Sequence, residues 1–494
     1  MLLFSVWGSI TTLWIVVSIL LIPDQLPMEK WRVPEQFRWL LTAAALLLAP
    51  IALPILAVCN WSCAMAARKR DLELQREQER LNDLVLENSR GVFDPNKLRT
   101  GSSGEARSMV NVVKQIILHA IDRGASDIFI DPKAEGGSSV RIRANGSLHP
   151  LRDLNDTDAK SVVSVIKVVA QMDISEHRMP QDGAFSARIG GVPISFRAAS
   201  VGAYSGEKLS LRVLGTPAGP RTLKDLGLAP ADLELLEKAV KLPSGLVLVC
   251  GPTGSGKTST LYAMLQDIDF SLKNVISIED PIENIIPNVS QIEVNNKAGV
   301  TFASLLRNSL RQNPDILCLG EIRDAETAEI AIQAAQTGHL ILATVHSNDN
   351  IGTIDRLQNL GVPLRTIAET LHLVISQRLV RTLCPQCRQR IELPAEYREY
   401  FAAAGLRTDN VFQNVGCSAC DGTGFTGRRA VFDILVIDGE LRETLGGENV
   451  NLAAIQNILE QKTGGNVIAY KAFQLVAAGI TTIDEVNRVT FDLG

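Results

Sequence analysis

Two long uncharged stretches dominate the hydrophobic pattern at the start of the chain. The first covers residues 2–22, 21 in a row, and the second covers residues 39–61, 23 in a row. A helix needs about 20 residues to cross the hydrocarbon core of a bilayer, so each stretch is long enough to span it. The alternative is a cleaved signal peptide followed by one buried helix, but no basic residue precedes Leu2, as such a peptide requires. We therefore expect residues 1–66 to form a membrane anchor of two transmembrane helices.

Basic residues follow the second stretch and indicate its orientation. Arg68, Lys69 and Arg70 come directly after it, and clusters of this kind stay on the cytoplasmic side of a membrane. Both ends of the chain, and nearly all of its remaining residues, are then cytoplasmic. Residues 67–104 are highly charged at first and end in a Thr-Gly-Ser-Ser-Gly sequence, which is typical of flexible linkers. We interpret this segment as a charged helix and a linker.

Alternating apolar and polar positions predict a small α+β domain over residues 105–215. A helical pattern covers residues 109–121, and strand patterns follow it. Two pairs of strands are separated by Asn-Gly and Gly-Gly dipeptides, which favour hairpins. Arg197 and Arg212 fall on the polar face of two of these strands. The alternation by itself favours solvated arginines there.

A continuous apolar run at residues 246–250 predicts a buried parallel strand. The sequence GPTGSGKT follows it directly and matches the phosphate-binding loop at every fixed position. A helix over residues 259–266 completes the expected context. Backbone N–H groups at such a helix start bind anions, Lys257 would reach the β- and γ-phosphates, and the Thr258 hydroxyl would hold Mg²⁺. The predicted nucleotide-binding residues are Gly251, Pro252, Thr253, Gly254, Ser255, Gly256, Lys257, Thr258 and Ser259.

Three further apolar strands are each followed by a polar cluster. Glu283 follows the strand at residues 275–278, Glu321 the strand at 316–319, and His346 the strand at 340–345. Ligands of open α/β sheets bind at the carboxyl ends of the strands, so these clusters should meet the phosphate-binding loop at one edge. Carboxylates that activate water and support a metal ion, with cations on the γ-phosphate, are what a nucleotide hydrolase needs.

Four of the eight cysteines have the spacing of a structural zinc site. Cys384 and Cys387 form one C-x₂-C pair, and Cys417 and Cys420 form the second. Disulfides are the competing interpretation, which a reducing cytoplasm disfavours. The gap between the pairs implies an inserted segment, within a zinc-binding region of about residues 380–430.

The composition excludes one class of protein and argues against another. Of 494 residues, 46% are hydrophobic and 21% are charged, which excludes an intrinsically disordered chain. The net charge of −5 argues against a surface that binds nucleic acid directly. A mean hydropathy of +0.12 is high for a soluble enzyme of this size, and the two uncharged stretches explain it.

The motifs together resemble the secretion ATPases that drive type II secretion and type IV pilus assembly. The resemblance covers roughly residues 105–494. Besides the phosphate-binding loop, it rests on IEDPIE at 278–283, NPDILCLGEIRD at 313–324, TGHLILATVHSND at 337–349 and the cysteine-bearing sequence at 383–427. The four cysteines indicate the assembly or secretion branch, because retraction ATPases of the family generally lack them.

The resemblance implies a PAS-like domain before a RecA-like motor domain over residues 216–494, in a homo-hexamer that hydrolyses ATP with Mg²⁺ and also binds Zn²⁺. It implies that Glu283 activates water and that Glu321 acts in the shell of Mg²⁺ and water. His339 and His346 would sense the state of the nucleotide. It also implies that Arg197 and Arg212 lie near the γ-phosphate, instead of being solvated surface residues.

The implied partners are a platform protein of the bacterial inner membrane and, through residues 1–66, the bilayer itself, with the ATPase domains on the cytoplasmic face. The chain departs from the family at Phe129, where His is usual, and at Asn313, where Asp is common. Its membrane hairpin also stands where most relatives have a soluble docking domain. Two alternatives are a DNA-uptake or conjugation motor of the same superfamily and a nucleotide-gated scaffold without turnover.

Overall fold

The computed structural model describes residues 103–215, 222–295, 298–447 and 466–490, with shorter pieces between residues 65 and 93 and at residues 455–458. The chain divides into two compact units, Met1–Asp83 and Leu84–Gly494. None of the helices in the described part of the chain has the length and apolar character needed to cross a membrane. The two predicted transmembrane helices lie outside the described residues.

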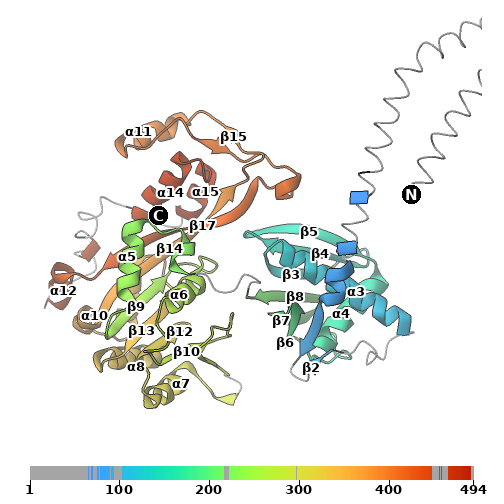
Figure 1. Cartoon of the computed structure of the whole chain (residues 1–494), viewed down its shortest axis with the longest axis horizontal. Helices are drawn as coiled ribbons and strands as arrows, with labels where there is room; N and C mark the ends of the chain where they lie inside the picture. Colours follow the sequence, from blue (N-terminus) through green and yellow to red (C-terminus); the bar gives the residue numbers. More distant parts are fainter. Residues whose placement is uncertain are drawn as a thin grey trace, which may run out of the picture. The chain divides into compact units, whose positions relative to one another are not determined.

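The second unit begins with a small domain built on an eight-stranded sheet (Figure 1), whose strand order is β2-β1-β6-β7-β8-β3-β4-β5. All neighbouring strands in it are antiparallel. Its elements are β1 (Val85–Asn88), β2 (Gly91–Val92), α3 (Ser103–Asp122), β3 (Ala125–Pro132), β4 (Ser138–Ala144), β5 (Ser147–Leu154), α4 (Asp156–Val169), β6 (Gln181–Ile189), β7 (Val192–Ala203) and β8 (Gly206–Leu214).

Helices α3 and α4 pack together, and each contacts strands of this sheet. The strands have alternating buried and exposed positions, as β4 shows with every second side chain buried. The predicted helix and strands all lie within these elements. The sheet also recruits β1 and β2 from the segment that the sequence assigns to a charged helix and linker, and α3 begins inside the Thr-Gly-Ser-Ser-Gly sequence.

The large domain, residues 222–490, contains a seven-stranded sheet of order β11-β10-β12-β13-β9-β14-β17. All pairs are parallel except β14 with β17. Its elements are α5 (Pro230–Ala239), β9 (Gly245–Cys250), α6 (Lys257–Gln266), β10 (Val275–Glu279), β11 (Ser290–Glu293), α7 (Phe302–Ser309), β12 (Ile316–Leu319), α8 (Ala325–Gln336), β13 (Leu340–Val345), α9 (Asn350–Asn359), α10 (Leu364–Thr370), β14 (Leu371–Leu383), β17 (Phe425–Val436), α12 (Gly439–Gly446), α14 (Val467–Ala477) and α15 (Ile483–Thr490).

Both faces of this sheet are buried, which explains why its parallel strands are apolar throughout. One core joins alternate residues of the strands, such as Leu246 and Leu248, to side chains of α7, α8, α9, α10 and α12. The other joins the intervening residues, such as Val247 and Val249, to α5 and α6. The central parallel strands therefore lie between two layers of helices, and their carboxyl ends meet at one edge.

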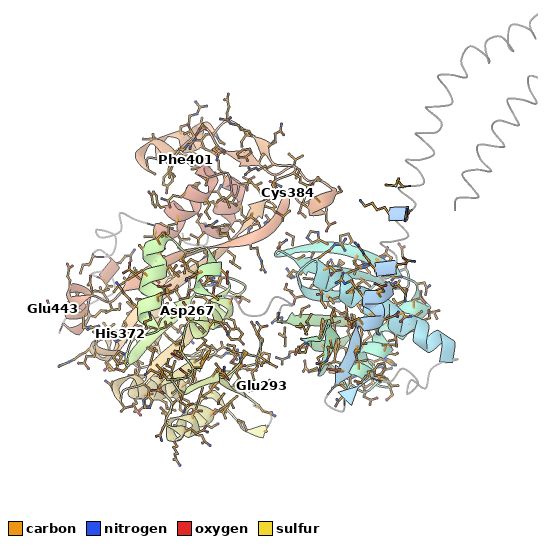
Figure 2. All side chains as sticks on the ribbon, viewed as in Figure 1. Asp267, Glu293, His372, Cys384, Phe401 and Glu443 are labelled. Carbon is orange, nitrogen blue, oxygen red and sulfur yellow. The ribbon has the colours of Figure 1, made fainter. Side chains whose placement is uncertain are left out.

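A third core lies where β14 and β17 extend beyond the other strands. It includes Phe401 of α11 (Ala395–Ala403) and Phe473 of α14. The segment between the two cysteine pairs forms α11 and a two-stranded sheet of β15 (Gln389–Arg390) and β16 (Phe412–Gln413). The predicted inserted segment is thus a folded subdomain. Figure 2 shows Cys384 and Phe401 in this part of the large domain.

Candidate active site

The phosphate-binding loop lies between the end of β9 and the start of α6. Its turn needs glycine, because Gly251, Gly254 and Gly256 have φ angles of +142°, +80° and +92°. The loop also packs tightly on Gln377 of β14. A Cβ at position 251 would lie 2.5 Å from the Gln377 carbonyl oxygen, and one at position 256 would lie 2.8 Å from Gln377 Nε2. Larger residues would therefore push the loop off its support.

The side chains around this loop fit an anionic phosphate. Lys257 Nζ folds back and donates to the carbonyl oxygens of Gly251 at 2.8 Å and Pro252 at 3.1 Å. Ser255 Oγ is buried without a hydrogen-bond partner among the described residues. The first-turn N–H groups of α6 have no partner within the helix, and Thr258 and Ser259 belong to that turn. Backbone donors, a cation and an unpaired hydroxyl are the groups that would hold the phosphates of ATP.

Glu321 follows β12 and faces the same loop. One of its carboxylate oxygens pairs with Arg323, and the other lies 3.1 Å from His346 Nε2 but receives no hydrogen bond. Burial lowers the pKa of the Lys257 ammonium, and the charge of Glu321 acts in the opposite direction. An almost fully buried carboxylate oxygen without a donor beside the phosphate loop fits a ligand or water of Mg²⁺.

Glu283 lies in the loop after β10, against α6. Its backbone N–H donates to Tyr262 Oη at 3.2 Å. Burial raises the pKa of the Glu283 carboxyl, the charge of Glu279 raises it further, and Arg212 lowers it. A carboxylate with a raised pKa at the edge of a phosphate site suits general-base chemistry.

The two arginines of the small domain are direct neighbours. Arg197 and Arg212 face each other across β7 and β8. Like charges in this position destabilise a sheet unless an anion compensates them. Arg212 has one such partner, since its Nε lies 3.3 Å from Asp127 Oδ1, yet 67% of its side chain is exposed. Arg197 is exposed and has no ion pair among the described residues.

The linker end of β8 brings this pair of arginines close to the catalytic loop. A Cβ on Gly215, the residue after β8, would lie 2.6 Å from Asn284 Oδ1. Arg212 also acts on the pKa of Glu283. Arg212 therefore lies close enough to the Glu283 loop to act on its charge, and the position of both arginines near a γ-phosphate stays a prediction.

His339 is the one predicted catalytic residue that the structure does not bring to this site. It precedes β13, whereas His346 follows it. Because β9 and β13 are parallel, His339 lies at the opposite edge of the sheet from the phosphate loop, roughly 20 Å away at about 3.3 Å per residue. Its Nδ1 is 3.0 Å from the Ala334 carbonyl oxygen. His339 therefore lies at the start of the strand, and its role in sensing the state of the nucleotide stays a prediction.

The four cysteines of the predicted zinc site come together. Their sulfur atoms all lie within 4.8 Å of one another, and three of the separations are 3.7, 3.8 and 3.9 Å. Tetrahedral coordination with Zn–S bonds of about 2.3 Å needs sulfurs about 3.8 Å apart. Burial opposes ionisation of Cys420, but N–H groups of Cys417 and Gly424 lower its pKa to about 6. The residues therefore fit a Zn²⁺ ion.

Four further residues of this region were given no role by the sequence analysis: Tyr262, Glu279, Arg323 and Gln377. Glu279 and Arg323 lie within the motifs IEDPIE and NPDILCLGEIRD, and that was the signal that could have found them. Gln377 lies between Ser376 and Arg378 in β14, where the sequence pattern does not single it out.

Known proteins match this chain over the same region. The family described as "Type II/IV secretion system protein" matches residues 103–488. The Type II secretion system protein HxcR of Pseudomonas aeruginosa is 40% identical over 386 residues, which cover 78% of each chain. The Type IV pilus assembly ATPase PilB of Thermus thermophilus is 39% identical over 384 residues, or 77% of this chain and 43% of that protein.

Solved structures show the same fold. The ATPase DotB of Legionella pneumophila aligns with 77% of this chain and 95% of its own, with a TM-score of 0.58 and 22% identity. The pilus retraction motor PilT with bound ADP aligns with 76% of this chain and 96% of its own, with a TM-score of 0.52 and 25% identity. The chain thus has the α/β fold of these ATPases.

Proposed function

This chain belongs to the type II/IV secretion system protein family, and we propose that it couples ATP hydrolysis to the assembly of a type IV pilus or a type II secretion pseudopilus. Relatives at 37–40% identity carry the names of type II secretion and type IV pilus assembly ATPases. The chain is accordingly a secretion ATPase, whose substrate is ATP and whose cofactor is Mg²⁺. The architecture that we propose is a PAS-like small domain followed by a RecA-like motor domain.

The observation that supports hydrolysis most directly is the convergence of four loops at one edge of the sheet. The phosphate loop, Glu283, Glu321 and His346 all follow carboxyl ends of parallel strands. Ser255 Oγ and Glu321 Oε2 are buried there without hydrogen bonds among the described residues. Since buried polar groups are nearly always satisfied, these two atoms point to a polar ligand between them.

We assign roles to the residues of this edge as follows. Lys257 and the backbone of residues 251–256 hold the phosphates, and Thr258 with Glu321 supports Mg²⁺. Glu283 accepts a proton from the attacking water. Arg212 and Arg197 neutralise the γ-phosphate as its charge develops, which such arginines can accelerate by about 10³–10⁵.

The free energy of ATP hydrolysis is passed on as motion between the small and large domains. A single subunit has no filament to push, so we propose a homo-hexamer that turns against a platform protein of the inner membrane. Residues 1–66 would anchor it to the bilayer, with both domains on the cytoplasmic face. Direct nucleic-acid contact is not expected from a net charge of −5.

Turnover of ATP by variants tests the assignment of the base. We expect Glu283→Gln to lower kcat by about 10² or more, because general bases contribute about 10²–10⁴, while ADP binding is kept. Lys257→Ala should lose ADP binding as well. Glu443→Gln on α12, an exposed carboxylate far along the chain from these loops (Figure 2), is the matched control and should keep wild-type kcat. Equal, near-zero turnover of wild type and Glu283→Gln in assembled hexamers would contradict the proposal and favour a nucleotide-gated scaffold.

A further inference from the structure

A buried hydrogen-bond network connects the helix of the phosphate loop to the loop that holds Glu283. Its centre is Tyr262 on α6, a side chain only 3% exposed. Tyr262 Oη donates to Glu279 Oε2. The same oxygen accepts the backbone N–H groups of Glu283 at 3.2 Å and Asn284 at 3.3 Å. One phenol thus holds two consecutive peptide groups of the catalytic loop.

Glu279 is the anchor of this network. It is the last residue of β10 and is 4% exposed. Its other oxygen accepts from Ser277 Oγ at 2.7 Å and from Gln291 Nε2 at 3.0 Å. A buried carboxylate is costly unless donors satisfy it, and three side chains from different elements do so here.

Gln291 closes the network from the far side of the loop. Its amide nitrogen also donates to the Asn284 carbonyl oxygen at 2.9 Å, and its Oε1 accepts the Ile286 N–H at 2.7 Å. Residues 283–286 are therefore bound at both ends, to Tyr262 on one side and to Gln291 on the other. The loop has no regular secondary structure to fix it, so these bonds decide where Glu283 lies.

We propose that Tyr262 is a positioning residue for hydrolysis, which holds the Glu283 backbone against the helix that begins at the phosphate loop. The proposal rests on the assignment of Glu283 as the base. Because Tyr262 lies on α6, whose first turn binds the phosphates, its hydroxyl fixes the catalytic carboxylate relative to the bound nucleotide. Glu279, whose charge also raises the pKa of Glu283, accepts the hydrogen bond of the same phenol.

Tyr262→Phe tests this, since it removes one oxygen atom and keeps the ring in the core. We expect kcat for ATP to fall about 10- to 100-fold, because small misplacements of a catalytic group cost that much. KM for ATP and the affinity for ADP should stay within about twofold, because the phosphate loop is untouched. Tyr397→Phe is the matched control: its hydroxyl accepts from Asn487 Nδ2 at 2.7 Å in the third core, and kcat should not change.

A double variant separates positioning from general loss of stability. If Tyr262 acts through Glu283, Tyr262→Phe combined with Glu283→Gln should be no slower than Glu283→Gln alone. A wild-type kcat for Tyr262→Phe, or losses that multiply in the double variant, would overturn the positioning role while leaving Glu283 as the base. Full turnover of Glu283→Gln would overturn both. Melting temperatures of all variants, measured alongside, should differ by only a few degrees.

Discussion

At the scale of single residues, three glutamates at or just beyond the ends of β10 and β12 have different roles because their surroundings differ. Glu279 is enclosed by hydrogen-bond donors and serves as an anchor. Glu283 lies at an exposed position of its loop, yet desolvation and the charge of Glu279 raise its pKa, which suits a base. Glu321 pairs with Arg323 and keeps one oxygen without a donor, which suits the shell of a metal ion. The residue type is the same in each case, so the environment decides the chemistry.

Asp433 of β17 is another carboxyl whose surroundings shift its pKa, and this shift affects the stability of the fold. Burial raises its pKa to about 6; Lys471 opposes the shift, and the charges of Asp349 and Asp232 add to it. Lys471 compensates little, because it pairs with Asp232 at 2.7 Å. A carboxyl whose pKa is raised on folding stabilises the native state below its unfolded pKa of about 4. That stabilisation is lost as the pH rises through about 6.

We therefore expect Asp433→Asn to stabilise the protein at neutral and higher pH. The melting temperature of the variant relative to wild type should rise by a few degrees between pH 4.5 and pH 8, as roughly 1–3 kcal/mol of ionisation cost is removed. Thermal unfolding followed over this pH range measures it. Asp182→Asn, at an exposed position of β6, should show no such trend. A difference that shrinks as the pH rises would contradict the assigned direction of the shift.

At the scale of elements, β14 connects the nucleotide site to the zinc cluster. Gln377 near its middle supports the phosphate loop and accepts from Thr260 Oγ1 at 2.7 Å. The strand ends at Leu383, directly before Cys384. Between them, the Arg381 guanidinium lies 4.2 Å from the centre of the Phe425 ring and pairs with the buried Glu485 of α15 at 2.8 Å. The four cysteines thus lie at the far end of the pair β14 and β17, where a bound Zn²⁺ would hold the two strands together.

Loss of the metal should loosen this end of the sheet first. We expect purified protein to contain one Zn²⁺ per chain and Cys417→Ser to contain none, with a melting temperature lower by several degrees. Metal analysis and thermal unfolding measure the two effects. Cys318→Ala, which changes a buried cysteine of β12 outside the cluster, should keep its zinc. A full complement of zinc in Cys417→Ser would contradict the four-cysteine site.

Elements with a strong local pattern were predictable from the sequence. The apolar run of β9, the glycines that follow it and the hairpin dipeptides each specify their structure over a few residues. β1 was not predictable in this way. Its four residues adjoin a highly charged segment, and they form a strand through pairing with β2 and with Arg188, Ala187 and Ser186 of β6. Such pairing joins residues about a hundred positions apart, which periodicity does not reveal.

The residues of the candidate site also divide into those that the local sequence pattern predicts and those that come together only in the folded chain. Glu283, Glu321 and His346 could be found because each follows a recognisable strand. Tyr262 could not, because its partners at positions 279, 283 and 284 meet it only after α6 packs beside β10. His339 was assigned by resemblance, and its place before β13 puts it at the opposite edge of the sheet from the phosphate loop.

At the scale of the whole molecule, a motor that pushes on a membrane machine must itself be held. If the two uncharged stretches of residues 2–22 and 39–61 form the membrane anchor that we propose, attachment does not depend on a docking domain. We expect the full chain to fractionate with membranes in a bacterial host that lacks pilus and secretion proteins, and to resist extraction by salt but not by detergent.

Deletion of residues 1–66 should move the protein to the soluble fraction while its ATP turnover is kept, since the nucleotide site lies wholly beyond residue 84. Glu443→Gln, at an exposed position outside the two stretches, is the control and should leave the protein in the membrane fraction. Retention of the 1–66 deletion at the membrane of that host would show that another part of the chain binds the bilayer.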